Sequence, residues 1–315
     1  MVQYFIKQAG KLVVIDAPQA NCWINITPPI DMKELEMLSE TFEVPLDFFT
    51  DPLDADERAR YEREEDARLI LLNSAIHTDS DSENEAIYIT VPLGIILVSD
   101  IVMTISAVEN PIIELLLGQK VRNFDPSDEK QVVLQLMNLN IQRFLLCLRK
   151  LNIKRNLTEQ ELHASTRSND LKQLLRIQKS LVYFVNSLSA NELLKMKIKR
   201  TNFLGINGDE DKMDFFEDII IDSSQALEMA NVHTNILNST MGSYSTIISN
   251  NLNEVIQRLT LITIIIAIPT LISSFYGMNV PVPLGESPYA FFIILVFAAL
   301  VAGVMVLFLR RNQLF

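Results

Sequence analysis

Residues 259–275 read LTLITIIIAIPTLISSF, and residues 289–309 read YAFFIILVFAALVAGVMVLFL, with no charged side chain in either run. Each run approaches the length of about 20 residues that a helix needs to cross a hydrocarbon layer about 30 Å thick. A buried helix of a soluble protein is the alternative for one such run, but two runs in tandem favour a membrane. Because only residues 277–288 connect them, we expect a helical hairpin with both chain ends on one side.

The charges that flank the two spans predict their orientation. Arg258 precedes the first span, and Arg310 and Arg311 follow the second, whereas the connecting loop has no basic residue and one acid, Glu286. The positive-inside rule then places both termini in the cytoplasm and the loop outside a cell (inner or plasma) membrane. Residues 1–11 lack the long apolar run of a signal peptide, which agrees with a cytoplasmic N-terminal domain.

Helical spacing predicts one polar stripe of mostly small side chains along the first span. The second span has no hydroxyl except that of Tyr289 at its edge, so we expect the first span to line a pore and the second to face lipid. The alternative is that each hydroxyl bonds back to a carbonyl of its own helix. Pro269 should kink this helix. The candidate pore-lining residues are Asn253, Ile256, Leu259, Thr260, Thr263, Ala267, Thr270 and Ser274.

A four-residue motif ends the first span, and it carries a resemblance to a known family. A Gly-Met-Asn triplet after a proline-containing span, with Tyr before it and an Asn-Glu-Val triplet starting at Asn253, resembles the CorA family of magnesium transporters. ZntB-type zinc transporters share this signature. The resemblance implies that the motif forms the outer mouth and selectivity filter, where hydrated Mg2+ is selected through its water shell. The motif consists of Tyr276, Gly277, Met278 and Asn279.

The resemblance also implies the architecture of the whole chain. It predicts a funnel-shaped homopentamer whose subunit has an α+β cytoplasmic domain, a very long stalk helix and a two-helix transmembrane hairpin. A pore formed by two helices per subunit needs several copies in a closed ring in any case. The expected division is a domain at 1–205, a cytoplasmic stalk at 206–258, spans at 259–279 and 289–309, an outer loop at 280–288 and a basic tail at 310–315.

The chemistry of Mg2+ independently favours neutral oxygens at the mouth. Mg2+ dehydrates reluctantly and usually keeps several waters, so a filter for the hydrated ion should bind it weakly enough for release. A ring of Asn279 amide oxygens meets this condition, and Gly277 would permit the close approach or unusual backbone of such a ring. The alternative role for Asn279 is a helix C-cap at the membrane surface.

The segment before the first span predicts a long helix with an acidic face. Between residues 209 and 275 the chain has one glycine, Gly242, and one proline, and a continuous helix of this length spans on the order of 100 Å. Spacings of three and four residues place four carboxylates on one face, where like charges repel unless a cation lies among them. These four are Asp211, Asp214, Asp218 and Asp222.

The resemblance implies a regulatory role for this acidic face. Asp218 falls where the family's stalk-helix sensor aspartate lies, and the family is thought to close when Mg2+ binds between cytoplasmic domains. The acidic loop that contains Asp79 and Asp81 is a candidate partner surface. We therefore predict that internal Mg2+ bridges these groups and holds the ring shut. The alternative is a solvated helix face beside a solvated loop.

Residues before the stalk predict an α+β domain, because strand-like runs come first and helical patterns follow. Ala9, Gly10 and Lys11 predict a hairpin turn. The strand-like runs are 2–6, 12–15, 22–27, 67–76, 87–91, 95–98 and 101–106. The helical patterns are 31–42, 127–151 and 170–200, with 152–169 as either a connection or a continuation.

Composition excludes several functional classes. The chain has 315 residues, 49% of them hydrophobic, a net charge of −12 and a mean hydropathy of +0.20. This acidity argues against nucleic-acid binding and fits a protein that handles cations. Cys22 and Cys147, without CxxC spacing, predict reduced thiols. Walker A, GxSxG and HExxH motifs are absent, so we expect no enzyme and no ATP-driven pump.

Three functions remain from the sequence. The first is a passive Mg2+ channel, with Co2+ and Ni2+ as further substrates and the membrane potential as driving force. The second is a ZntB-like zinc transporter, although the pore stripe has no Cys or His for bare Zn2+. The third is a membrane-anchored metal sensor that conducts nothing. The outer loop lacks the family's common Met-Pro-Glu-Leu-like run, and Glu286 would serve there to attract cations.

Overall fold

The computed structural model describes residues 1–78, 85–121, 124–164, 168–280, 283 and 288–311. Its contacts divide the chain into two units, Met1–Ser239 and Thr240–Phe315. The first unit contains an α+β domain and the start of a 67-residue helix, and the second contains the rest of that helix and a C-terminal apolar helix. The predicted order of α+β domain, long helix and apolar helix is therefore confirmed.

Among the described residues, seven strands form one sheet in the order β2-β1-β3-β7-β6-β5-β4. Neighbouring strands are antiparallel except β3 and β7, which are parallel. Ala9 and Gly10 form the predicted turn between β1 and β2, with φ values of 50° and 80°. The strands are β1 Val2–Gln8, β2 Lys11–Ile15, β3 Trp23–Ile26, β4 Arg60–Glu64, β5 Ala67–His77, β6 Tyr88–Val98 and β7 Ile101–Ile105.

The helices follow the predicted patterns, with additions. Asp31 caps the first helix by accepting a hydrogen bond from the Lys33 N–H at 3.0 Å. Residues 152–164 continue the preceding helix. Of the two alternatives for 152–169, a connection or a continuation, the continuation is therefore correct up to residue 164. The helices are α1 Met32–Phe42, α2 Asp47–Thr50, the 3-10 helix η1 Asp51–Leu53, α3 Pro111–Leu117, α4 Glu129–Ala164, α5 Ser168–Thr201, α6 Glu210–Tyr276 and α7 Ala290–Arg311.

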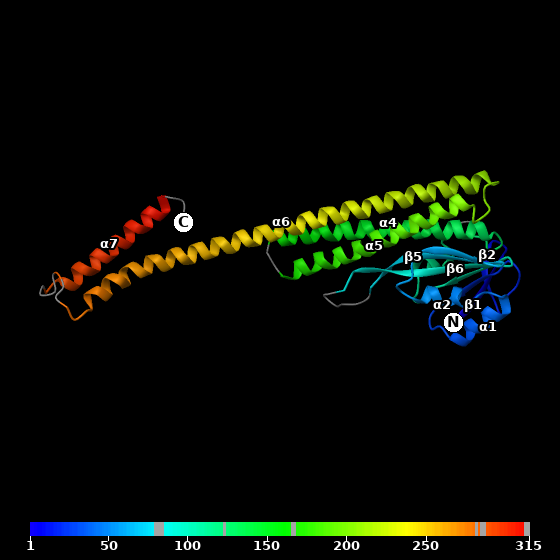
Figure 1. The fold of residues 1–315 in the computed structure, drawn as a ribbon, viewed down its shortest axis with the longest axis horizontal. Helices are drawn as coiled ribbons and strands as arrows, with labels where there is room; N and C mark the ends of the chain where they lie inside the picture. Colours follow the sequence, from blue (N-terminus) through cyan, green and yellow to red (C-terminus); the bar gives the residue numbers. More distant parts are fainter. Residues whose placement is uncertain (79–84, 122–123, 165–167, 281–282, 284–287, 312–315) are drawn as a thin grey trace. The chain divides into compact units, whose positions relative to one another are not determined.

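The sheet lies between two helical layers (Figure 1). One face packs against α1 and α2, where Leu35, Phe48 and Phe49 are buried. On the other face, α4 and α5 pack against β5 and β6, and the rings of Phe144 and Phe184 meet edge to face at 5.1 Å. Because both faces are covered, the central strands are apolar on both sides, and β6 and β7 are buried along most of their length.

The prediction of two separate strands at 87–91 and 95–98 is wrong, because β6 runs unbroken through Pro92 and Gly94. Pro92 lies beyond the ladder with β7, which begins at Gly94, so proline occupies a position where it is tolerated. Gly94 allows a close approach, since a Cβ there would lie 2.5 Å from the Pro52 Cγ and 2.9 Å from the Ile105 Cγ2.

Two asparagines complete the backbone hydrogen bonding of β5 beyond the end of its ladder with β4. That ladder ends where Arg60 faces Leu71. The Asn73 N–H donates to the Asn191 Oδ1 at 3.0 Å, and the Asn73 carbonyl accepts from the Asn140 and Asn191 Nδ2 atoms at 3.0 and 2.8 Å. Because Asn140 lies on α4 and Asn191 on α5, the helical layer is anchored to the strand by buried polar groups.

The first part of α6 packs with α4 and α5 (Figure 1). The Gln178 amide donates to the Asn238 Oδ1 at 2.8 Å, and the Lys195 ammonium donates to the Ser223 Oγ at 2.7 Å. Lys195 is 1% exposed and Ser223 is fully buried. A lysine with a neutral hydroxyl partner in the protein interior is costly to charge. Burial lowers the pKa of Lys195 from 10.5 to about 7.

In the second unit, α7 and the C-terminal part of α6 are long and apolar enough to cross a membrane. Their most apolar 18-residue stretches have mean hydropathies of 3.1 and 2.1, and only 11% and 6% of the residues in those stretches are buried. Large side chains such as Leu259, Phe291 and Leu307 are exposed along them. Helices of this composition require an apolar surrounding. They contain the two spans that the sequence predicts.

Substituting Gly94→Ala should destabilise the α+β domain, because the new methyl would overlap the rigid ring of Pro52. Overpacking of this kind costs about 1–3 kcal/mol, which is measurable by chemical denaturation of the purified full-length protein. Gly208→Ala is the matched control, since a Cβ there would meet nothing within 4 Å. Equal stability of the two variants would contradict the close approach of Pro52 to Gly94.

Substituting Lys195→Met should stabilise the protein, and the gain should shrink as pH rises from 7 to 9. The folded state lowers the pKa of Lys195, so the unfolded state binds more protons between about pH 7 and 10.5, and wild-type stability rises with pH there by about 1.4 kcal/mol per unit. Thermal unfolding at each pH measures the difference between variant and wild type.

The exposed Lys199, which pairs with Glu217 at 2.6 Å, provides a control as Lys199→Met. Its stability difference from wild type should stay constant over the same pH range. A constant difference for Lys195→Met as well would mean that Lys195 is not desolvated in the folded state.

Candidate ion pathway

Four of the predicted pore-lining residues lie together on α6. Thr263, Ala267, Thr270 and Ser274, joined by Ile266 and Leu271, line an open groove of about 450 Å³. All six side chains are exposed in the single chain. Ile266 and Leu271 were not predicted, although they follow Thr263 and Ala267 at helical spacings of three and four. The groove therefore has a polar strip between apolar margins.

The hydroxyls of the stripe bond back to the helix. Thr260, Thr263 and Thr270 donate to the carbonyls of residues 256, 259 and 266 at 2.8, 2.8 and 2.9 Å. The alternative weighed for single hydroxyls is therefore present at these three positions. It does not exclude a pore-facing role, because each hydroxyl oxygen retains acceptor capacity after its proton is donated. Waters around a cation turn their protons outward, and an acceptor is what such protons need.

Pro269 lies inside the groove segment, and α6 continues through it without interruption. Proline has no N–H, so the carbonyl four residues earlier, that of Ile265, loses its usual helical donor. In a membrane, an unpaired carbonyl is tolerated where it meets water or a neighbouring group. The kink predicted at Pro269 stays a prediction.

The helix ends at the four-residue motif. The Gly277 N–H donates to the Ser273 and Ser274 carbonyls at 3.0 and 3.2 Å, and the Met278 N–H lies 3.4 Å from the Phe275 carbonyl. The φ of Gly277 lies outside the left-handed region, and a Cβ there would make ordinary contacts at 3.5 and 3.6 Å. An unusual backbone at Gly277 is therefore not found in this chain, whereas close approach between copies stays a prediction.

Asn279 follows the helix end and is exposed, as are Gly277 and Met278. Its side-chain amide makes no hydrogen bond with the residues that the structure describes, so the amide oxygen is available to a ligand. At the other end of the span, Asn253 and Ile256 are exposed, and Glu254 forms an ion pair with Arg258 one turn later. This pair partly neutralises the predicted inner end of the pathway.

The predicted sensor aspartates lie on α6 in the first unit. Asp211, Asp214 and Asp218 are exposed, and the half-buried Asp222 accepts a hydrogen bond from the Gln142 Nε2 at 3.3 Å. No group of three or more His, Cys, Asp or Glu side chains in the described ranges could hold a metal ion. A metal at these aspartates therefore needs ligands from water, another copy or residues outside the description. Asp79, Asp81 and Glu286 lie outside the described residues.

Comparisons with known proteins agree with this arrangement. A family model described as CorA-like Mg2+ transporter protein matches residues 18–311. The cobalt/magnesium transport protein CorA of Methanocaldococcus jannaschii is 27% identical over 292 residues, which cover 92% of this chain and 90% of that protein.

Two solved structures are similar in fold. The complete structure of the CorA magnesium transporter from M. jannaschii superposes with a TM-score of 0.82 at 24% identity, over 99% of this chain and 98% of that one. The cytoplasmic domain of ZntB from Vibrio parahaemolyticus superposes with a TM-score of 0.60 at 10% identity, over 79% and 98%. The second likeness, at 10% identity, shows a shared fold.

Proposed function

Because this chain belongs to the family of CorA-like Mg2+ transporter proteins, we propose that it is a passive channel that carries Mg2+ across the cell membrane. Members of this family are membrane transporters for divalent cations. The observation that carries the proposal of a Mg2+ channel is the groove lined by Thr263, Ala267, Thr270 and Ser274. Five copies around an axis would bring five such grooves together.

The groove suits a hydrated cation because it offers oxygen acceptors without charge. Bare transition metals are held by imidazole, thiolate or carboxylate ligands, and none of these side chains lines the groove. A hydrated Mg2+ needs acceptors for its water protons and weak binding for release. In this proposal, a ring of Asn279 amides selects the hydrated ion, Glu286 attracts cations to the mouth, and the two termini lie in the cytoplasm.

We further propose that internal Mg2+ regulates the channel at the acidic face of α6. Exposed carboxylates at Asp211, Asp214 and Asp218 repel one another in the absence of a cation. Mg2+ between neighbouring subunits would remove this repulsion and favour the closed ring, with Asp79 and Asp81 as candidate partners. Differential binding of this kind shifts a conformational equilibrium by the ratio of the two affinities.

Two other functions remain as alternatives. ZntB-like zinc transport is the first, because ZntB-type transporters share the Gly-Met-Asn motif that this chain carries at residues 277–279. A membrane-anchored metal sensor would need the threonine stripe to be incidental. Flux into liposomes that contain the purified protein separates the three, with Mg2+, Zn2+ or no divalent ion outside. Mg2+ flux supports the channel, Zn2+ flux without Mg2+ flux supports the zinc transporter, and no flux supports the sensor.

In the same liposomes, the double variant Thr263→Val and Thr270→Val should reduce Mg2+ flux about tenfold. Valine preserves shape but removes two acceptors from each subunit, and a lost hydrogen bond is worth about 1 kcal/mol. The matched control is Thr263→Ser with Thr270→Ser, which keeps both oxygens and should keep most of the flux. Wild-type flux from the valine variant would remove these hydroxyls from the pathway.

The sensor proposal predicts that Asp218→Asn with Asp222→Asn abolishes protection by Mg2+ against limited proteolysis. Wild-type protein should be cleaved more slowly when Mg2+ is present, since the bridged ring is more compact. Asp16→Asn, on an exposed residue at the end of the β1–β2 hairpin, serves as the control for lost negative charge and should keep the protection. Unchanged protection in the Asp218 and Asp222 variant would argue against a sensor on this face.

A further inference from the structure

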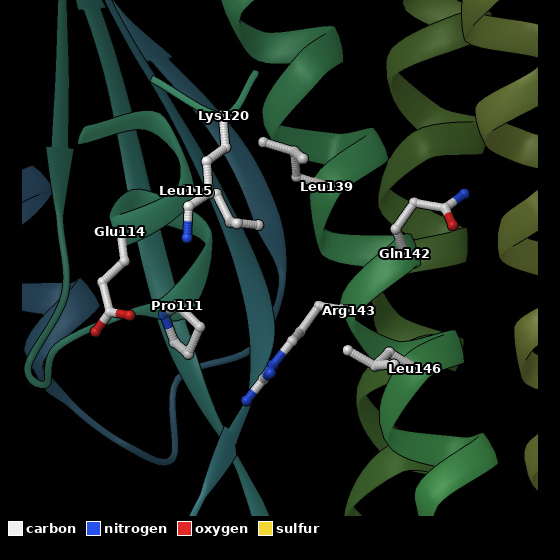
Figure 2. Close-up of a pocket in the computed structure, with 8 residues that line it drawn as sticks. All are labelled: Pro111, Glu114, Leu115, Lys120, Leu139, Gln142, Arg143 and Leu146. Carbon is white, nitrogen blue, oxygen red and sulfur yellow. The ribbon is translucent and has the colours of Figure 1, made fainter. Parts of the chain in front are cut away.

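A cleft in the first unit lies between α3 and α4, and no residue of the proposed ion pathway or sensor lines it. It has a volume of about 300 Å³ and is lined by Pro111, Glu114, Leu115, Lys120, Leu139, Gln142, Arg143 and Leu146. Figure 2 shows Pro111, Leu115 and Lys120 on one side of the cleft and Leu139, Arg143 and Leu146 on the other. This volume is at the lower end of the range for small-molecule sites, about 300–1,000 Å³.

The walls of the cleft are mainly apolar. Leu115 and Leu139 are half-buried, and Leu146 is 45% exposed although its neighbours Leu145 and Cys147 on α4 are buried. With Pro111 they form an apolar lining on both sides of the cleft. An occupant with an apolar body would remove this surface from water, at about 25 cal/mol per Å².

Two cationic groups converge on the same cleft. The Arg143 Nε donates to the Ala75 carbonyl of β5 at 3.1 Å, which fixes the guanidinium while its terminal nitrogens make no hydrogen bond with described residues. Figure 2 shows this side chain extending from α4 across the cleft towards the sheet. A guanidinium held in this way presents a rigid fork of donors to a carboxylate or phosphate.

Lys120 supplies the second cation. Its stem packs over Gly118, where a Cβ would lie 3.6 Å from the Lys120 Cε, and its ammonium has no hydrogen bond or ion pair with described residues. Glu114 contributes one negative charge to the rim, so the three ionised side chains sum to +1. In a chain of net charge −12, a cleft with two unpaired cations is a local exception that favours an anion.

We propose that this cleft binds a small organic anion, a carboxylate or phosphate attached to an apolar body. The charged group would lie between Lys120 and Arg143, and the apolar body against Leu115, Leu139 and Leu146. A cation would be repelled by the two basic groups. A neutral apolar molecule would remove Lys120 and Arg143 from water without replacing the hydrogen bonds that water makes with them.

The cleft is connected to α6 through Gln142. The stem of Gln142 lines the cleft, and its amide donates to Asp222 on the acidic face of α6 at 3.3 Å. In Figure 2 the amide is directed away from the cleft. A bound anion that shifts the Gln142 stem would therefore alter Asp222, so we infer that the ligand modulates Mg2+ protection. This second step rests on the proposed regulatory function, whereas binding itself does not.

Binding is tested with phenyl phosphate and the full-length protein in lipid nanodiscs, by calorimetry. Phenyl phosphate should bind at least about tenfold more tightly than either inorganic phosphate or phenol, because only it uses both parts of the cleft. Lys120→Glu, which reverses a surface charge, and Leu139→Trp, which fills the cleft, should each weaken binding about tenfold or more. Arg63→Glu, in a polar cleft elsewhere in the domain, should leave it unchanged.

Three results would overturn the site. The first is that phenyl phosphate does not bind to the wild type, which is expected if another copy of the chain covers the cleft. The second is that inorganic phosphate binds as tightly as phenyl phosphate. The third is that the Lys120 and Leu139 variants bind phenyl phosphate as tightly as the wild type. If Leu139→Trp fails to fold, Lys120→Glu alone decides. Coupling is tested with Gln142→Met, which keeps an unbranched stem against the cleft but removes the donor.

The Gln142 variant should bind phenyl phosphate like the wild type. In the presence of Mg2+, however, phenyl phosphate should no longer change the rate at which the variant is cleaved by protease. An unchanged effect would refute the route through Gln142. If Mg2+ does not protect the wild type from proteolysis at all, the sensor proposal is contradicted, but the result on phenyl phosphate binding still holds.

Discussion

The structure depends on one constraint, which is that backbone N–H and C=O groups in hydrocarbon must be paired within the chain itself. Helices α6 and α7 meet it over their apolar stretches, except at the Ile265 carbonyl, which loses its donor to Pro269. Their side chains are therefore free to be exposed to lipid or to other copies. The hydroxyls of Thr260, Thr263 and Thr270 follow the same rule by donating to helix carbonyls. Polar residues on the first span are thereby satisfied without water while their oxygens remain acceptors. Back-bonding and pore lining are compatible roles of the same side chain.

One helix has to meet two different environments. In the first unit, α6 is held by polar groups of α4 and α5, including the buried Lys195–Ser223 contact and the Gln178–Asn238 contact. In the second unit it is apolar and exposed, and it carries the groove. The small buried residues Ala226 and Ala230 allow close packing in the bundle, whereas the span has bulky aliphatic residues around a narrow strip of Thr, Ala and Ser. The change in residue types along α6 therefore reflects a change in what surrounds the helix, from a packed bundle to an apolar environment.

The sequence predicts those features whose residues are neighbours on a single element. The spans follow from long uncharged apolar runs, the start of α6 from a stretch almost free of proline and glycine, and the threonine stripe from helical periodicity. Most strands follow from short apolar runs. Strand β4, with the sequence RYERE, is an exposed edge strand and has no apolar pattern. Strand β6 runs unbroken through Pro92 because its ladder with β7 begins only at Gly94. The local sequence around Pro92 does not reveal where that ladder begins. The contacts of Gln142 with Asp222 and of Arg143 with Ala75 join residues about 70 to 80 positions apart, beyond any local signal.

The parallel pairing of β3 with β7 joins parts of the domain that lie far apart in the sequence. Strands β4 to β7 pair with their neighbours in the chain, whereas β1 lies between β2 and β3 and pairs with both. In the sheet, the two groups meet along the β3–β7 ladder, where Trp23–Ile26 align with Val102–Ile105. The Trp23 indole donates to the Thr104 hydroxyl at 2.9 Å. Closing a loop of this length costs entropy before any contact repays it. We therefore expect β3 and β7 to pair late in folding, because the residues that they align are about 80 positions apart in the sequence.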